Sequence, residues 1–126
     1  MRRQDLLAYV IGAAVAGTAL VFPYAGRAFI SIYMPLLIPV DAPFFLLPIA
    51  WGAWNVLWIR LHPTLAAPAW GALLGLLMAT AGNLLLAVRG QWTAPLLLLA
   101  LWVPAIYAIG WTFFVVPLNR ALDVDP

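Results

Sequence analysis

Charged residues divide the chain into long uncharged stretches made almost entirely of apolar side chains. Four of the five stretches have at least 18 residues; the five cover positions 6–26, 28–40, 42–59, 61–88 and 90–119. A helix needs about 20 apolar residues to cross the roughly 30 Å hydrocarbon core of a bilayer. The pattern therefore predicts four transmembrane helices, and one stretch is too short to span.

Turn and capping residues set the expected ends of these helices. Pro23 should stop the first. The second and fourth should begin at Asp41 and Thr93, each followed by Ala-Pro, because a side-chain oxygen can accept from free amides and an early proline gives up an unpaired donor. We expect one transmembrane domain, 1–126, folded as a compact antiparallel bundle of helices at about 6–22, 42–59, 67–88 and 94–118.

The stretch 28–40, between the first two helices, carries no charge and is rich in isoleucine, leucine and aromatic residues. Pro35 and Pro39 prevent a regular helix through it. Its apolar side chains are poorly suited to a solvated loop. We therefore expect an interfacial or re-entrant segment, and a surface-lying loop is the simpler form of that arrangement.

Composition supports an all-α integral membrane protein. Hydrophobic residues make up 67% of the 126 positions and charged residues 8%, against about 25% in soluble domains. The mean hydropathy is +1.05. The net charge of +2 comes from scattered arginines, which form no basic patch for nucleic acid. The absence of cysteine excludes disulfides and thiolate metal sites.

The arginines near helix ends predict the orientation, because arginine favours the cytoplasmic side of short loops. We therefore expect a protein of the bacterial inner membrane with both chain ends on the cytoplasmic side. An N-terminal secretory signal is the alternative, since arginines precede an apolar stretch that ends near small residues. The arginines expected inside are Arg2, Arg3, Arg60 and Arg120, and those expected outside are Arg27 and Arg89.

Small residues recur every four positions in the third expected helix, at Gly71, Gly75 and Ala79. Such a stripe lets another backbone approach closely, and close packing drives helix association in lipid. The first helix offers a matching surface at Gly12 and Ala16. We therefore expect a helix contact at the stripe, within the chain or with a partner chain, and the first helix is the favoured neighbour.

Asn55 and Asn83 are the strongest polar groups inside the second and third helices. In antiparallel helices they would lie near opposite membrane faces and would not bond each other. Buried amides in membrane helices usually hydrogen bond to a neighbouring helix. We interpret both as contacts between helices, with a binding site as the alternative.

Trp51, Trp54 and Trp58 recur at helical spacing, and plain packing against a neighbour is the expected role of such an aromatic stripe. A pigment, quinone or lipid stacked on Trp51, Trp54 and Trp102 is the alternative. A single histidine, His62, cannot supply two axial haem ligands within one chain. With packing as the expected role of the tryptophans, we expect no cofactor.

Two groups of charged residues are candidate sites. Asp41 is expected to cap a helix and to lie on the same outer face as Arg27 and Arg89. The alternative is that Asp41 belongs to an ion or proton site. No carboxylate is expected at the midplane of the membrane, and this argues against a coupled transporter, which usually needs one there. Arg60 and His62, in the inner loop, could contact an anionic lipid headgroup.

A weak internal repeat is visible when the chain is divided at Pro63. Each half has a helix with small residues, an arginine expected outside, and a second helix that begins with Asp/Thr-Ala-Pro and ends in arginine. Each second helix also contains an internal proline, Pro48 or Pro104. Such symmetry is typical of membrane proteins built from duplicated units.

No enzyme constellation occurs: there is no acid pair at working distance, no Ser-His-Asp set, no metal-ligand cluster and no phosphate-binding glycine loop. We expect a non-catalytic accessory or structural subunit of a larger membrane complex, with membrane lipids and other subunits or further copies as partners. A small oligomeric transporter or channel is the first alternative, with a path along Asp41, Asn55 and Asn83. A pigment- or quinone-binding subunit is the second.

Overall fold

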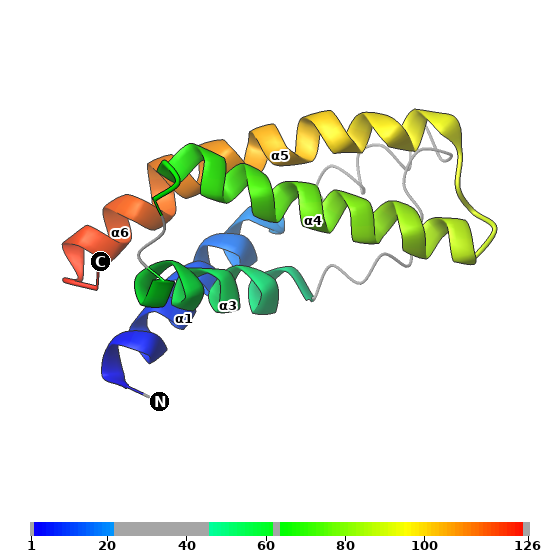
Figure 1. The fold of residues 1–126 in the computed structure, drawn as a ribbon. Coiled ribbons are helices and arrows are strands. Elements are labelled where there is room, and N and C mark those ends of the chain that lie inside the picture. Colours follow the sequence, from blue (N-terminus) through cyan, green and yellow to red (C-terminus); the bar gives the residue numbers. More distant parts are fainter. Residues whose placement is uncertain (1, 22–45, 62–63, 125–126) are drawn as a thin grey trace.

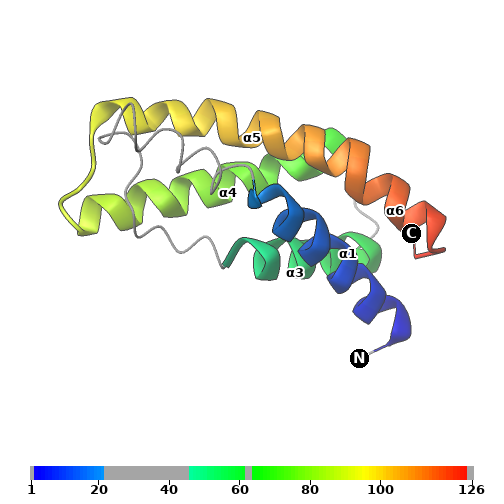
Figure 2. The same ribbon diagram turned by 180° about the vertical axis from the view of Figure 1, so that it is seen from behind.

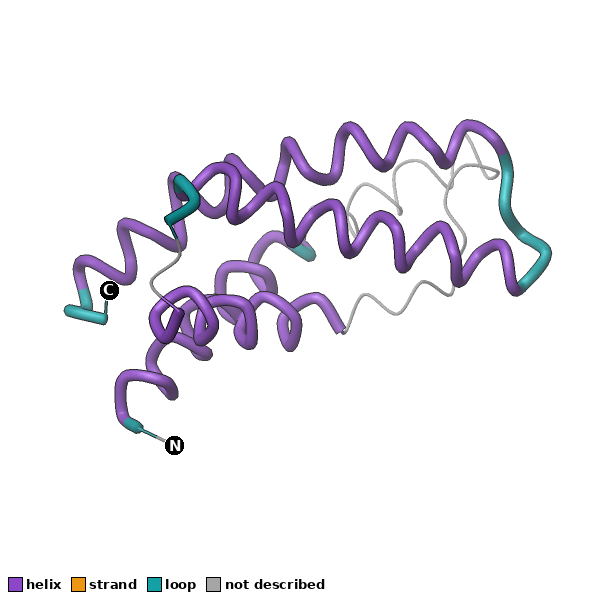
Figure 3. The backbone as a smooth tube through the Cα atoms, in the orientation of Figure 1, coloured by secondary structure: helices purple, strands orange, loops and turns teal. Residues whose placement is uncertain are grey.

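The computed structural model describes residues 2–21, 46–61 and 64–124, and over these ranges the chain consists of helices joined by turns (Figure 3). The first elements are α1 (Arg3–Ala19), α3 (Leu46–Leu61) and α4 (Ala67–Val88). The last is one continuous helical segment made of a 3-10 turn, η1 (Ala94–Leu98), then α5 (Leu99–Gly110), a π-helical turn, η2 (Trp111–Val115), and α6 (Val116–Ala121).

Two of these segments are long and apolar enough to cross a membrane, Ala67–Val88 and Ala94–Ala121, while α3 is apolar but shorter. The expected range 67–88 agrees with α4 residue for residue. The fourth helix continues to Ala121, three residues further than expected, and the first runs from Arg3 to Ala19 rather than from 6 to 22. The expected segment 28–40 and the cap at Asp41 lie outside the described residues.

The helices form two antiparallel pairs, α1 with α3 and α4 with the continuous segment from η1 to α6 (Figures 1 and 2). The longer pair extends beyond the shorter one at the end where Gly90 turns the chain. The start of α1 and the end of α6 lie together at the opposite end (Figures 1 and 2). This arrangement brings the polar residues near both chain ends to the same region of the molecule.

Glycines allow close approach within each pair. An ideal Cβ on Gly75 would lie 2.6 Å from the Cα of Pro104, and one on Gly71 would lie 2.6 Å from the carbonyl oxygen of Tyr107. A Cβ on Gly12 would meet the Trp51 carbonyl. The stripe on α4 therefore packs on α5, while α1 packs on α3. The expectation that the first helix would be the neighbour of Gly71 and Gly75 is wrong.

The helix ends follow recognisable capping patterns. Gly90 adopts a φ of +67° after α4, and the amide of Gln91 donates to the carbonyl of Leu86 at 2.9 Å, as in a Schellman motif. Asp123 takes the same role after α6 with a φ of +55°, and the Val124 amide donates to the Asn119 carbonyl at 2.9 Å. This turn places Val124 in the hydrophobic core.

The fourth helix begins as expected after Thr93, but the expected side-chain cap is absent. The Thr93 backbone carbonyl instead accepts from the Leu96 amide at 3.0 Å, because the chain opens with a 3-10 turn. Pro95 in that turn has no amide hydrogen to satisfy. The proline therefore sets the helix start without a threonine cap.

The π-helical turn keeps residues spaced by four on one face of the last segment. Tyr107, Trp111, Val115 and Asn119 are all buried. In a regular α-helix, four residues exceed a full turn by about 40°, so three such steps would rotate Asn119 about 120° away from Tyr107. A wider turn with i→i+5 hydrogen bonds reduces this drift. Asn119 thereby reaches the interior.

Candidate functional site

The interior of the bundle contains a polar layer near the ends of the chain. Asn55 of α3 and Asn119 of α6 both have no exposed surface. Their amides exchange hydrogen bonds, Asn55 Nδ2 to Asn119 Oδ1 at 2.9 Å and Asn119 Nδ2 to Asn55 Oδ1 at 2.8 Å. Asn55 Nδ2 also donates to the Ala8 carbonyl at 2.8 Å. One amide pair thus links α1, α3 and α6.

Sequence reasoning singled out Asn55 but missed Asn119. Asn119 directly precedes Arg120 at the end of the last helix, where a polar residue is easily interpreted as part of an exposed helix end. The signal that could have found it is its position near a helix end: Asn55 lies five residues before Arg60 and Asn119 one residue before Arg120, so both lie in the last part of helices that end with an arginine. As expected, Asn55 and Asn83 do not bond each other.

An ion pair lies next to this polar layer. Arg60 donates through Nε to Asp5 Oδ1 at 3.0 Å and through Nη2 to Asp5 Oδ2 at 2.7 Å. The Arg2 backbone amide donates to the same Oδ2 at 3.0 Å. Asp5 is only 3% exposed, whereas 58% of the Arg60 side chain is exposed. The guanidinium therefore shields the carboxylate from solvent while remaining partly hydrated.

Hydrogen bonds from Arg60 are the main reason that the pKa of Asp5 is lowered to about 2, and desolvation acts against this lowering. The residue precedes the apolar range 6–22 and is ionised at neutral pH. Its stabilising effect is present above the ordinary pKa of 3.8 and is lost as the pH falls through about 2. The ion pair is therefore not a switch in the physiological range.

The remaining candidate charges are only partly described. Arg60 contacts Asp5 and still exposes much of its side chain, while His62 lies outside the described residues. Arg89 is exposed at the end of α4 and has an electrostatic or hydrogen-bond partner; Arg27 and Asp41 lie outside the described residues. The proposed outer-face cluster of Asp41, Arg27 and Arg89 stays a prediction.

Asn83 forms hydrogen bonds that connect α4 with η1 and with the turn between them. Its Nδ2 donates to the carbonyls of Ala79 at 2.9 Å and Leu96 at 3.3 Å, and its Oδ1 accepts from Trp92 Nε1 at 3.0 Å. These partners lie near the Gly90 turn, far along the bundle from Asn55. Asn83 thus holds its hairpin together, and it shares no hydrogen bond with the polar layer.

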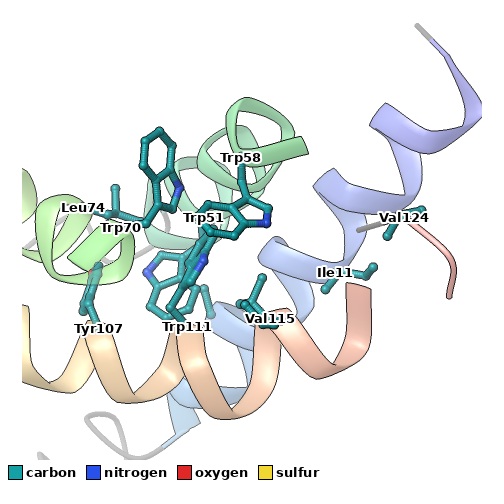
Figure 4. Close-up of a cluster of buried hydrophobic side chains, with 11 residues drawn as sticks. Ile11, Trp51, Trp58, Trp70, Leu74, Tyr107, Trp111, Val115 and Val124 are labelled. Atoms are coloured by element: carbon teal, nitrogen blue, oxygen red, sulfur yellow. The ribbon is translucent and has the colours of Figure 1, made fainter. Parts of the chain in front are cut away.

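Aromatic side chains fill the space between the two helix pairs (Figure 4). The ring of Trp51 lies 4.8 Å from Tyr107 and 5.8 Å from Trp111 by their centroids. Trp54 stacks on Trp70 at 4.7 Å and donates from Nε1 to the Trp70 carbonyl at 3.1 Å. Packing therefore accounts for Trp51 and Trp54, while Trp102 is exposed on the outside of α5.

Three indole N–H groups in this aromatic layer have no acceptor among the described residues. They belong to Trp58, Trp70 and Trp111, all buried. A buried donor without a partner costs on the order of 1–3 kcal/mol. Native proteins usually satisfy such a group with water or another bound molecule. A hydrogen-bond acceptor placed in this layer would therefore be stabilised by up to three donors that have no partner among the described residues.

The other residues of the small-residue surfaces also lie inside. Ala79 continues the buried face of α4, and Ala16 belongs to the core on α1. Across the described ranges, no three histidine or carboxylate side chains gather as a metal-binding group. Comparison of the chain with protein-family models, with curated proteins and with solved structures finds no match.

Proposed function

We propose that this chain is a polytopic membrane protein with four spanning helices and both ends in the cytoplasm of a bacterium. We further propose that it serves as a non-catalytic accessory or structural subunit of a larger complex in the inner membrane. The carrying observation is the outer face of the last helical segment. The large exposed apolar residues of this segment include Leu98, Leu101, Trp102, Ile106, Ile109 and Phe113.

Trp102 makes this outer face better suited to a protein partner than to lipid alone. It is 66% exposed and lies roughly 12 Å along the Ala94–Ala121 segment, at a rise of about 1.5 Å per residue. Tryptophan in contact with lipid prefers the headgroup region, where its N–H can be hydrated. Exposed aromatic residues are also the usual anchors of protein interfaces. A covering helix from another subunit would remove Trp102 from contact with lipid and use it as such an anchor.

The internal hydrogen bonds support a structural role. Asn55, Asn119 and Asn83 direct their amides to other groups of the same chain. The carboxylate of Asp5 is held by Arg60. These polar groups therefore stabilise the bundle, and the outer surface is left for association.

Purification in a mild detergent, followed by a native gel and mass spectrometry, tests the subunit proposal. We expect the parent chain to travel with other membrane proteins, and Trp102→Ala or Phe113→Ala to weaken that association roughly thirtyfold, as expected for loss of about 2 kcal/mol at an interface anchor. Leu84→Ala, at an exposed position of α4, is the matched control. A parent chain that migrates alone as a monomer would refute the proposal.

Cysteine labelling tests the topology, and the absence of native cysteine gives a clean background. Single cysteines at Gln4, Gln91 and Leu122 are suitable because all three positions are exposed. We expect an impermeant reagent added outside intact cells to label position 91 and to leave 4 and 122 unlabelled until the membrane is opened. Labelling of position 4 or 122 from outside would exclude this orientation.

A specific observation favours a second candidate, a pigment- or quinone-binding subunit. The unpartnered N–H groups of Trp58, Trp70 and Trp111 lie in an aromatic layer. Neutral carbonyl groups on a flat ring system would match both the donors and the rings. If a visible or near-ultraviolet absorption band beyond that of the protein co-purified with the chain, it would favour this second candidate over the accessory subunit. The path proposed for a transporter gains less support, since Asn55 and Asn83 bond to separate partners.

A further inference from the structure

We propose that the chain is a tandem duplication of one helical-hairpin unit, and that the aromatic face of each unit is the docking surface for the other. The first unit contains α1 and α3, and the second contains α4 and the segment from η1 to α6. The proposal depends on matching sequence patterns and on matching contacts. It does not require the subunit function proposed above.

The first helices of the two units share a pattern of small residues. In α1 the pattern runs Ala8, Gly12, Ala13 and Ala16, and 59 positions later α4 has Ala67, Gly71, Ala72 and Gly75. The spacing is identical, and the single difference replaces one small residue by another. A stripe with this spacing presents one face to a neighbouring helix.

The second helices share a different pattern, proline followed three positions later by an aromatic residue and then a small one. It reads Pro-Ile-Ala-Trp-Gly at 48–52 in α3 and Pro-Ala-Ile-Tyr-Ala at 104–108 in α5, 56 positions apart. The internal prolines that marked the weak repeat in the sequence are the first residues of these patterns.

The structure brings the two patterns together in the same way in both units. A Cβ on Gly12 would meet the carbonyl oxygen of Trp51 and would lie 3.0 Å from the Cα of Gly52. A Cβ on Gly71 would lie 2.6 Å from the carbonyl oxygen of Tyr107 and 3.1 Å from the Cα of Ala108. In each unit the glycine at the equivalent position thus packs on the carbonyl of the aromatic residue and on the small residue that follows it.

Equivalent residues also meet at the boundary between the units. Trp51 and Tyr107 occupy the same place in the two patterns, and their rings pack at 4.8 Å between centroids. A contact between equivalent positions is the mark of a two-fold, isologous interface. The aromatic layer in Figure 4 is therefore a surface by which one unit binds a second unit of its own kind.

The outer faces of the second helices have diverged. With a shift of 56 positions, Ile106 and Ile109 of α5 correspond to Ala50 and Ala53 of α3. At these two positions the second unit carries bulky side chains where the first has small ones. The resemblance between the units is therefore concentrated on the shared inner face, where they dock.

Circular permutation of the whole chain tests whether the units are interchangeable in order. The chain would start at Thr64 and end at Pro63, and Gly/Ser linkers of about 10 or 20 residues, which reach roughly 17 or 25 Å, would join the original ends. The start of α1 and the end of α6 lie at the same end of the bundle (Figures 1 and 2). We expect the helix content of the parent and an unfolding temperature within about 5 °C of it.

A matched control opens the chain inside the second unit, between Gly90 and Gln91, with the same linkers. We expect this permutant to unfold at a lower temperature than the one opened at 63, because α4 and the segment that packs on it are then joined only through the rest of the chain instead of by a short turn. A stable permutant opened at 90 together with an unfolded one opened at 63 would overturn the assignment of the units.

A second variant decides the matter if both permutants fail to fold. Trp51→Tyr and Tyr107→Trp exchange the equivalent aromatic residues in the natural chain order. If the positions are equivalent, the double variant unfolds at a temperature closer to the parent than the two single shifts predict by addition. A double variant that falls by the full sum, or further, would contradict the proposed equivalence.

Discussion

Replacing Gly75 with alanine will lower the free energy of unfolding by about 1–3 kcal/mol, the usual cost of overpacking a close contact. The new methyl group would meet the backbone of Pro104 at 2.6 Å, and a proline backbone in a helix cannot rotate away. Thermal or denaturant unfolding in detergent, followed by tryptophan emission, measures the loss.

Gly82→Ala is the matched control on the same helix, because a Cβ at Gly82 has no neighbour within 4 Å. Alanine there gains helix propensity, so stability should stay constant or rise by up to about 1 kcal/mol. Equal effects at Gly75 and Gly82 would show that α4 and α5 are not packed at this stripe.

The second large effect is expected at the buried amide pair. Asn55→Leu should cost about 1–3 kcal/mol, because it leaves the Asn119 amide buried without its partner and removes the additional bond to the Ala8 carbonyl. Adding Asn119→Leu should then cost much less than Asn119→Leu alone, since both polar partners are removed together. Unfolding of all four members of the double-mutant cycle measures the coupling.

A coupling of roughly 0.6–1.7 kcal/mol is the range expected for hydrogen bonds between helices in a membrane. Thr80→Ala is a suitable control, since its exposed hydroxyl bonds to the Leu76 carbonyl of its own helix and its loss should matter little. Strictly additive effects of the two leucine substitutions would mean that Asn55 and Asn119 do not interact.

The helices themselves were readable from the sequence because apolar stretches between charges are a strong signal. The pairing of the stripe was harder. Gly71 and Gly75 indicate a close helix contact but do not identify the helix that makes it. The first helix was a plausible neighbour because it carries a similar stripe of small residues. Chain order was the better guide: a short turn after Val88 favours an antiparallel neighbour, and α5 is that neighbour.

The polar layer was less accessible to sequence reasoning for a geometric reason. Regular α-helical spacing would place Asn119 on a different face from Tyr107, and the π-helical turn at 111–115 reduces that rotation. Asp5 was missed for another reason, because a charged residue so close to the start of a chain resembles a solvated end. Only the antiparallel packing of α1 on α3 brings it to Arg60.

In the topology proposed above, the pairing of Arg60 with Asp5 would give the arginine two roles at different times in the life of the protein. During insertion into the membrane α1 and α3 have not yet packed, so Arg60 would then be a positive charge without its carboxylate partner that helps to retain its loop in the cytoplasm. Asp5 does not cancel that effect, because acidic residues contribute little to orientation. After the helices meet, the same guanidinium holds the carboxylate. Under the proposed topology, a residue that first directs biogenesis would thus end as part of the folded structure, and its replacement would disturb both stages.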